Sequence, residues 1–192
     1  MVMKNSPLLI LVTGPNGAGK STLVLELFAN NIFPSELALV NPDIIAYEEQ
    51  VTPVVAGREA LRRREELLQQ KKNFILETTF SGNSEMRLIH KAKAQGYQIM
   101  LHFVSLESKA LSIARINMRV AKGGHDIPVA DVHRRFERCY ANMHKAQPLA
   151  DSFFLYDNSG LKRNTLLITR EKVVHHKFEC YEGRLKEYLS TY

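Results

Sequence analysis

Short runs of consecutive apolar residues alternate along the chain with longer segments in which apolar residues recur every three or four positions. The short runs predict buried strands, and the longer segments predict amphipathic helices. The expected strands are Leu8–Thr13, Leu37–Val40, Phe74–Leu76, Tyr97–Val104, Phe153–Tyr156 and Thr165–Thr169. The expected helices are Lys20–Asn30, Gly57–Lys72, Ser84–Gln95, Lys109–Lys122, Val129–Lys145 and a closing helix over Glu179–Leu189.

This alternation predicts an α/β fold of three layers, in which a mainly parallel sheet is covered by helices on both faces. The sequence has no repeat at solenoid spacing and no linker rich in Pro, Gly and Ser, so residues 1–192 are expected to form a single domain. Ligands of such sheets bind beyond the carboxyl ends of the strands. The polar residues that follow each expected strand are therefore the candidates for chemistry.

Composition narrows the class of protein without identifying its ligand. With 45% apolar and 24% charged residues, the chain is expected to be globular, and its Leu8–Val12 run is too short to cross a membrane. We expect a cytoplasmic protein whose two cysteines, Cys139 and Cys180, serve as small packing residues. The formal charge is −3 over residues 1–50 and +9 over residues 51–192, which favours nucleic acid, anionic surfaces or phosphorylated small molecules as partners.

Residues 14–21 match the phosphate-loop pattern GxxxxGK[ST] at every fixed position, between an expected strand and an expected helix. Such a loop aims backbone N–H groups at a phosphate chain, and the helix N-terminus adds its positive dipole end. Lys20 is expected to bridge the β- and γ-phosphates, and Ser21 to hold Mg²⁺. The residues expected to bind ATP are Gly14, Pro15, Asn16, Gly17, Ala18, Gly19, Lys20, Ser21 and Thr22.

Two carboxylates follow the neighbouring strands. Asp43 comes after Leu37–Val40 and faces the predicted cleft, where it could accept the proton of an attacking hydroxyl; alternatively, it caps the next helical turn. Glu77 ends the strand Phe74–Leu76, where it could hold a Mg²⁺-bound water, hydrogen-bond a sugar hydroxyl or cap a turn. The polar residues beside it that are expected to contact substrate are Thr78, Thr79 and Ser81.

Arginines concentrate on two consecutive helices over about residues 115–138. Arg115 and Arg119 share one helical face, and after Gly123-Gly124-His125 the next helix carries Arg134, Arg135 and Arg138. Two helices joined by a Gly-rich turn predict a hinged, arginine-bearing lid that brings positive charge onto a transferring phosphoryl group. A solvated face, with the arginines paired to nearby acids, is the alternative. His125 is expected to be a polar lid residue. Asn158, after the strand Phe153–Tyr156, could border the adenine or could belong to a tight turn.

Taken in order, these motifs resemble the zeta-toxin-like P-loop kinases. The resemblance runs from about Leu8 to Gly160 and rests on the following segments: GPNGAGKST, Asn41-Pro42-Asp43, Glu77-Thr78-Thr79 with Ser81-Gly82, Arg119-Val120 with Gly123–Pro128, Arg134-Arg135-Phe136 and Tyr156–Ser159. It implies a nucleoside-monophosphate-kinase-like fold and Mg²⁺-dependent transfer from ATP to a hydroxyl group, in some members that of UDP-N-acetylglucosamine. It also implies that Asp43 is the base, that Glu77 and Thr79 contact substrate, and that Arg119 or Arg115 supports the transition state. The resemblance leaves open an antitoxin-like protein partner.

We therefore expect a kinase that uses ATP and Mg²⁺ to phosphorylate a small molecule, with a UDP-amino sugar as a candidate acceptor. The first alternative is a polynucleotide-end kinase, favoured by the basic residues Arg58, Arg62, Arg63 and Arg64. It is disfavoured by the absence of interleaved aromatic residues that would stack on bases, so nucleic acid is not the expected partner. The second alternative is a regulatory module that binds ATP without transferring phosphate.

Overall fold

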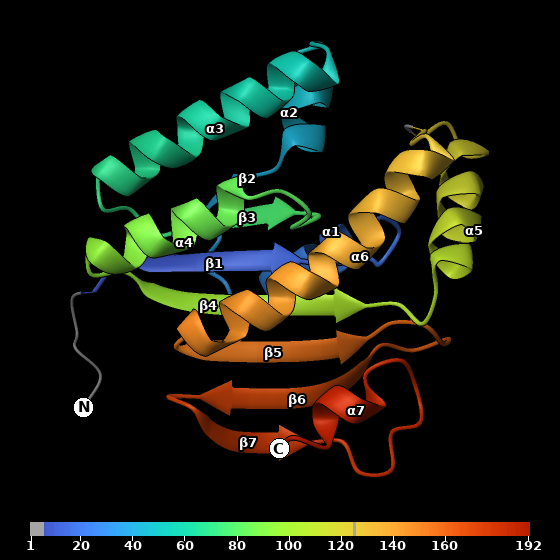
Figure 1. The fold of residues 1–192 in the computed structure, drawn as a ribbon. Coiled ribbons are helices and arrows are strands. Elements are labelled where there is room, and N and C mark those ends of the chain that lie inside the picture. The colour runs from blue at the N-terminus through green and yellow to red at the C-terminus, as the bar shows by residue number, and fades with distance from the viewer. Residues whose placement is uncertain (1–5, 125) are drawn as a thin grey trace.

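The computed structural model describes residues 6–124 and 126–192, which build one seven-stranded sheet of order β2-β3-β1-β4-β5-β6-β7 (Figure 1). Neighbouring strands from β2 to β5 pair in parallel, and β6 and β7 complete the sheet in antiparallel orientation. The strands are β1 Leu8–Thr13, β2 Ala38–Val40, β3 Phe74–Thr78, β4 Gln98–Ser105, β5 Ser152–Asp157, β6 Asn164–Arg170 and β7 Val173–Lys177.

Helices cover both faces of the sheet, which gives the three layers that the sequence predicts. In Figure 1, α4 and α6 cross the near face, α1 lies behind β1, and α5 stands beyond the carboxyl ends of the strands. The helices are α1 Lys20–Ala29, α2 Pro42–Glu48, α3 Pro53–Gln69, α4 Ser84–Ala94, α5 Lys109–Val120, α6 Val129–Ala146 and α7 Lys186–Leu189, with a 3₁₀ turn at Gln147–Leu149. The predicted α/β fold with a mainly parallel sheet is thus confirmed.

The central strands are apolar on both faces because each face is covered. In β4, Phe103 points toward α6 and packs edge-on against Tyr140, with their ring centroids 5.1 Å apart. The next residue toward the N-terminus, His102, points to the opposite face, where it stacks on Phe154 at 4.4 Å and meets Phe33 edge-on. Burial on both sides explains why strands of this type read as uninterrupted apolar runs.

The structure corrects four details of the sequence prediction. The helix expected from Gly57 begins at Pro53, because Thr52 caps it and proline suits the first helical position. Residues Pro42–Glu48 form a separate helix, α2, and the expected closing helix is only Lys186–Leu189. Strand β7 was not predicted, since its exposed residues Val173–Lys177 have no apolar alternation and are held by pairing with β6.

Among the described residues, no helix combines the length and the apolar character needed to span a bilayer. Cys139 is buried in α6, as predicted for a packing residue, and its Sγ lies 3.0 Å from the carbonyl oxygen of Phe136. The prediction for Cys180 is wrong, because that residue is exposed. It lies in the irregular segment between β7 and α7, where no element covers it.

Candidate functional site

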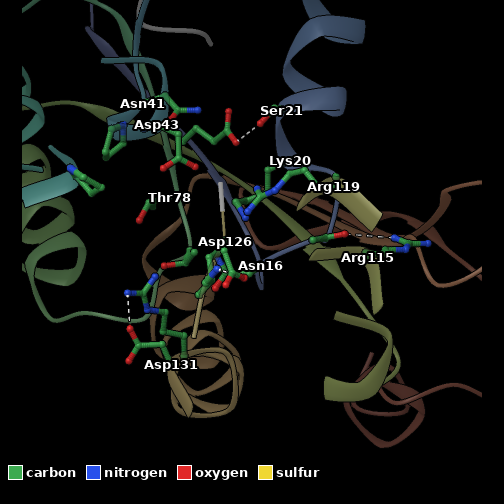
Figure 2. A pocket seen from close by; sticks show the side chains of 18 of the residues that line it. Asn16, Lys20, Ser21, Asn41, Asp43, Thr78, Arg115, Arg119, Asp126 and Asp131 are labelled. Atoms are coloured by element: carbon green, nitrogen blue, oxygen red, sulfur yellow. Dashed lines mark hydrogen bonds and ion pairs between the residues drawn. The ribbon is translucent and has the colours of Figure 1, made fainter. Parts of the chain in front are cut away.

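A cavity of about 670 Å³ lies at the carboxyl ends of β1, β2 and β3 (Figure 2). Most of the predicted site residues line it, although they come from segments spread over more than 100 positions of the chain. The predicted residues that line it are Asn16, Gly17, Gly19, Lys20, Ser21, Thr22, Asp43, Glu77, Thr78, Thr79, Arg115 and Arg119. Below, this cavity is called the cleft.

The phosphate loop has a conformation that its glycines make accessible. Gly14 has φ 141°, and a Cβ at this position would stand 2.2 Å from the carbonyl oxygen of Val104. Gly19 has φ 88° and is the N-cap of α1, with no side chain bonded to the first amide groups of the helix. Asn158 lies beside the loop and donates from Nδ2 to the carbonyl oxygen of Ala18 at 2.8 Å. The uncapped helix N-terminus therefore leaves N–H groups available for an anion.

Lys20 folds back over the loop, where Nζ donates to the carbonyl oxygens of Gly14 at 3.1 Å and Pro15 at 3.0 Å. Burial lowers the pKa of Lys20, while the nearby carboxylates of Glu77 and Asp43 act in the opposite direction. An ammonium group that has lost much of its hydration in this way is favoured by a polyanion beside it. Lys20 is thus placed to bind a phosphate chain that follows the loop.

Ser21 and Glu77 meet at the floor of the cleft. The Ser21 hydroxyl donates to Glu77 Oε1 at 2.6 Å (Figure 2). Glu77 lies within β3 rather than after it, and only 6% of its surface is exposed. Its Oε2 has no hydrogen-bond partner among the described residues, so a buried carboxylate oxygen is available beside the hydroxyl. A hydroxyl and a carboxylate in this arrangement suit a Mg²⁺ ion or its bound water.

Asp43 lines the cleft from the first turn of α2. The helix is capped by Asn41, whose Oδ1 accepts a hydrogen bond from the backbone N–H of Asp43 at 2.8 Å. The alternative in which Asp43 caps this turn is therefore wrong. The exposed carboxylate of Asp43 lies in the cleft and is not used as a helix cap. Pro42 at the first helical position helps to hold this turn in place.

The loop after β3 carries the predicted substrate contacts Thr79 and Ser81, whose hydroxyl oxygens lie 3.2 Å apart. Thr79 lines the cleft, whereas Ser81 is not among its lining residues. The loop is fastened by Asn142 of α6, which donates from Nδ2 to the carbonyl oxygens of Phe80 at 2.8 Å and Gly82 at 2.9 Å. Sequence reasoning missed Asn142; its signal is a polar residue on the buried face of α6.

The predicted arginines separate into two groups. Arg115 and Arg119 of α5 line the cleft, and Arg115 Nη1 lies 3.5 Å from the carbonyl oxygen of Gly17. On α6, Arg135 lines the cleft, but Arg134 does not. Arg134 and Arg135 both pair with Asp131, at 2.6 Å and 3.1 Å respectively.

Asp131 was not predicted as a site residue, and it lines the cleft beside Arg135. The hydrogen bond from Arg134 is the main cause that lowers the pKa of Asp131, so the carboxylate offsets positive charge on this helix. Arg138 is exposed on α6 and lies outside the cleft. His125, expected to be a polar lid residue, lies outside the described residues.

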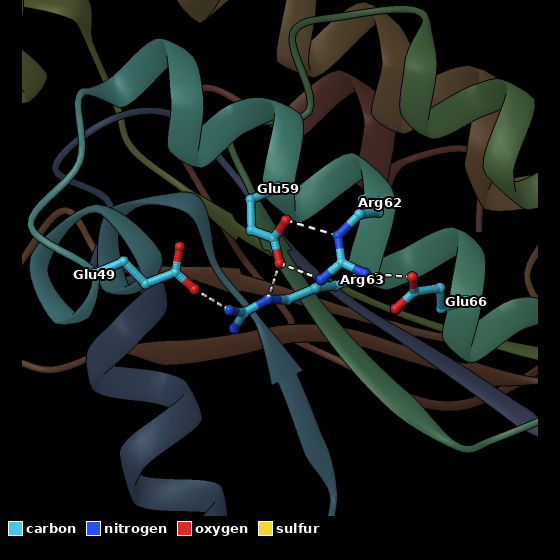
Figure 3. Close-up of polar contacts among 5 residues, drawn as sticks. All are labelled: Glu49, Glu59, Arg62, Arg63 and Glu66. Carbon is cyan, nitrogen blue, oxygen red and sulfur yellow. Dashed lines mark hydrogen bonds and ion pairs between the residues drawn. The ribbon is translucent and has the colours of Figure 1, made fainter.

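The basic face of α3 is largely neutralised within the protein (Figure 3). Arg62 pairs with Glu59 and Glu66, and Arg63 pairs with Glu59 and Glu49. Hydrogen bonds from the two arginines lower the pKa of Glu59 to about 2. These arginines therefore offer less net charge to a polyanion than their number in the sequence suggests.

Comparisons with known proteins identify a family and a relative that match this chain in sequence. The family model described as Zeta toxin matches residues 50–163. A relative from Haemophilus influenzae, described only as an uncharacterized protein, is 31% identical over 140 residues, which cover 70% of this chain and 95% of the relative. The family match and the kinase fold together support ATP-dependent kinase activity.

Solved structures share the fold at low sequence identity. The PezAT toxin–antitoxin structure of Streptococcus pneumoniae has a TM-score of 0.60 at 15% identity, covering 98% of this chain and 84% of that chain. The AvrRxo1-ORF1:ORF2 structure with ATP has a TM-score of 0.68 at 16% identity, again over 98% of this chain. The present chain spans 64% of the length of the AvrRxo1 chain that it matches.

Proposed function

Because this chain belongs to the zeta toxin family, we propose that it transfers the γ-phosphoryl group of ATP to a hydroxyl group of a small molecule. The observation that carries the proposal is the convergence in one cleft of the phosphate loop, Asp43, Glu77 and the α5 arginines. A phosphate cradle, a carboxylate and guanidinium groups around one space are the parts that phosphoryl transfer requires.

In the proposed reaction, the acceptor hydroxyl oxygen attacks the γ-phosphorus while Asp43 accepts its proton. The bond between the γ-phosphorus and the β–γ bridging oxygen breaks, and ADP leaves with that oxygen. Lys20, Arg115 and Arg119 offset the negative charge that spreads over the transferring group. The exposed carboxylate of Asp43 and its place in the cleft support this role.

Mg²⁺ is proposed as the cofactor because the donor set fits a hard cation. The hydroxyl of Ser21 and the buried, unpartnered Oε2 of Glu77 lie together at the floor of the cleft. Ser21 would bind the ion directly and Glu77 through a water molecule. Bound there, the ion would neutralise charge on the β- and γ-phosphates.

For the acceptor, the family supports a UDP-amino sugar such as UDP-N-acetylglucosamine as the first candidate. Thr78, Thr79 and Glu77 provide hydroxyl and carboxylate groups suited to sugar hydroxyls. The polynucleotide-end kinase is the weaker alternative, because Arg62 and Arg63 are already paired with carboxylates. An antitoxin-like protein is proposed as a partner solely because PezAT is a toxin–antitoxin system.

The test is label transfer from γ-labelled ATP to a panel of UDP-sugars, nucleosides and oligonucleotides. Asp43→Asn is expected to lower kcat about 10²- to 10⁴-fold and to leave ATP affinity within twofold, since the carboxylate acts on the acceptor. Glu48→Gln is the matched control, because Glu48 is an exposed acid on the same helix and does not line the cleft.

Wild-type turnover by Asp43→Asn would show that Asp43 is not the base. Tight ATP binding without transfer to any member of the panel would favour the regulatory module. Transfer to oligonucleotides alone, with affinity that falls steeply as salt rises, would favour the polynucleotide-end kinase.

A further inference from the structure

The turn that follows α5 folds back onto the last arginine of that helix. The backbone N–H groups of Lys122 and Gly124 both donate to the carbonyl oxygen of Arg119 at 3.0 Å, and that of Gly123 donates to the carbonyl oxygen of Val120 at 2.9 Å. Gly123 has φ 84°, a left-handed conformation that commonly ends a helix and that glycine adopts readily. One glycine therefore accounts for the end of α5.

A second glycine follows directly, and the backbone conformation does not require it. Gly124 lacks the left-handed φ of Gly123. It is required for space instead, because an added Cβ would stand 2.6 Å from Cγ and 3.0 Å from the carbonyl oxygen of Arg119. Carbon atoms attract at about 3.5–4.0 Å, so a separation of 2.6 Å is a collision. Gly124 is thus the surface against which the stem of Arg119 packs.

Arg119 stands between the cleft and another cavity, of about 360 Å³, which Gly124 also lines (Figure 2). Burial is the main cause that lowers the pKa of Lys20, and the positive charge of Arg119 acts in the same direction. The guanidinium group is therefore within electrostatic range of the phosphate loop. An arginine side chain has much rotamer freedom, so its direction is set by what packs against its stem.

The other cleft arginine of α5 is packed in the same way, against a glycine of the phosphate loop. A Cβ at Gly17 would stand 3.2 Å from Cβ of Arg115 and 3.1 Å from the carbonyl oxygen of Ser112. The hydroxyl of Ser112, which is fully buried, donates to the carbonyl oxygen of Asn16 at 2.6 Å. These contacts fix α5 on the phosphate loop. Arg119 lies one turn further along the helix, where Gly124 supplies the corresponding support.

Resting on the proposed kinase function, we propose that Gly124 is a positioning residue that acts through Arg119. The absence of a side chain at Gly124 lets the stem of Arg119 lie against the turn, and this packing directs the guanidinium group to the γ-phosphoryl group in the cleft. A methyl group at this position displaces Cγ and every atom beyond it. A displacement of about 1 Å at a reacting group can cost about 100-fold in rate.

The test compares two equilibrium affinities, so that it does not depend on turnover. The probes are ADP with Mg²⁺, and the same mixture with aluminium fluoride, which stands for the transferring phosphoryl group. In Gly124→Ala the affinity for the fluoride complex is expected to fall at least tenfold, while the affinity for ADP stays within twofold of wild type. Turnover should show the same separation, with kcat at least tenfold lower and the KM for ATP within twofold.

Gly123→Ala is the matched control, because it adds the same methyl group one residue earlier. A Cβ there meets no heavy atom of the described residues within 4 Å, but φ 84° makes alanine strained. The control should unfold at a lower urea concentration than wild type and keep its affinity for the fluoride complex within twofold. If Gly123→Ala lost as much of this affinity as Gly124→Ala, damage to the turn would be the cause and the inference would be overturned.

A double-mutant cycle shows whether the effect passes through Arg119. Arg119→Ala removes Cγ, so adding Gly124→Ala in that background should lower the affinity for the fluoride complex less than twofold further. Two losses that multiply would overturn the inference. A wild-type protein that binds the fluoride complex no more tightly than ADP would overturn it too, since Arg119 would then not reach the transferring group.

Failure of the kinase proposal has a different signature. In that case the variants would differ in their affinity for the fluoride complex as expected, and no label would pass from ATP to any acceptor of the panel. The inference about Gly124 would then stand without the reaction.

Discussion

Asn142 connects α6 to the loop that carries the predicted substrate contacts, and removing its amide should release that loop. The side chain is 6% exposed and donates to the carbonyl oxygens of Phe80 and Gly82. The loop needs this support because Phe80 is fully buried and has φ 59°, a left-handed conformation that a non-glycine residue adopts at a cost. Asn142 thus holds a strained turn next to the cleft.

The expected loss of stability follows from the two hydrogen bonds. Each is worth about 1 kcal/mol net, so Asn142→Ala should lower the free energy of unfolding by about 2 kcal/mol. For a chain of this size, that corresponds to a fall in Tm of about 4–8 °C. Asn142→Asp has nearly the same shape but places an oxygen where Nδ2 donates to both carbonyl groups, so it should destabilise the protein more than alanine does.

Urea unfolding of wild type, Asn142→Ala, Asn142→Asp and Lys145→Ala measures these differences, with the exposed Lys145 on the same helix as control. Because the loop carries Thr79, the KM for the acceptor should rise in Asn142→Ala while ATP affinity stays within twofold. If Asn142→Asp unfolded at the same urea concentration as wild type, the two hydrogen bonds would not be stabilising the loop.

Two further predictions concern the sheet and the phosphate loop. Burial lowers the pKa of His102 to about 3 in the folded protein. In the unfolded chain the imidazole binds a proton at a higher pH, so the free energy of unfolding decreases as pH falls below about 6.5. Between pH 7 and pH 5, the free energy of unfolding measured with urea should fall by about 2 kcal/mol because of His102. In His102→Phe this decrease should be absent. Gly14→Ala should destabilise by at least about 2 kcal/mol and abolish ATP binding, because its Cβ would collide with Val104. Gly96→Ala, with φ 84° and open space around the added Cβ, should cost only about 1 kcal/mol and leave ATP binding intact; equal effects of the two changes would contradict the steric argument.

The features that could be predicted are those encoded by neighbouring residues. The phosphate loop is a contiguous segment between a strand and a helix, so its pattern alone predicts its shape, and its ligand stays a prediction. The same holds for the strands β1 and β4, which are apolar because helices cover both faces. The short helix α2 was not resolved from its pattern, since seven residues provide too few turns for a periodic signal.

Some details of the site could not be predicted, because they depend on how the segments pack and turn in the folded protein. Arg134 and Arg135 are adjacent in sequence, and only the rotation of α6 about its axis turns Arg135 to the cleft and leaves Arg134 outside it. Whether Asp43 caps α2 was decided by the conformation of Asn41, which takes that role.

The phosphate loop could thus be derived from the order of amino acids, because its function depends on backbone geometry set by adjacent residues. The contact between Asn142 and the loop after β3 could not, since Asn142 and that loop are separated by 60 or more positions. Their contacts exist only after the sheet has formed and α4 and α6 have packed on it. Side-chain packing between distant segments has no local pattern, so the folded structure alone determines which polar groups meet.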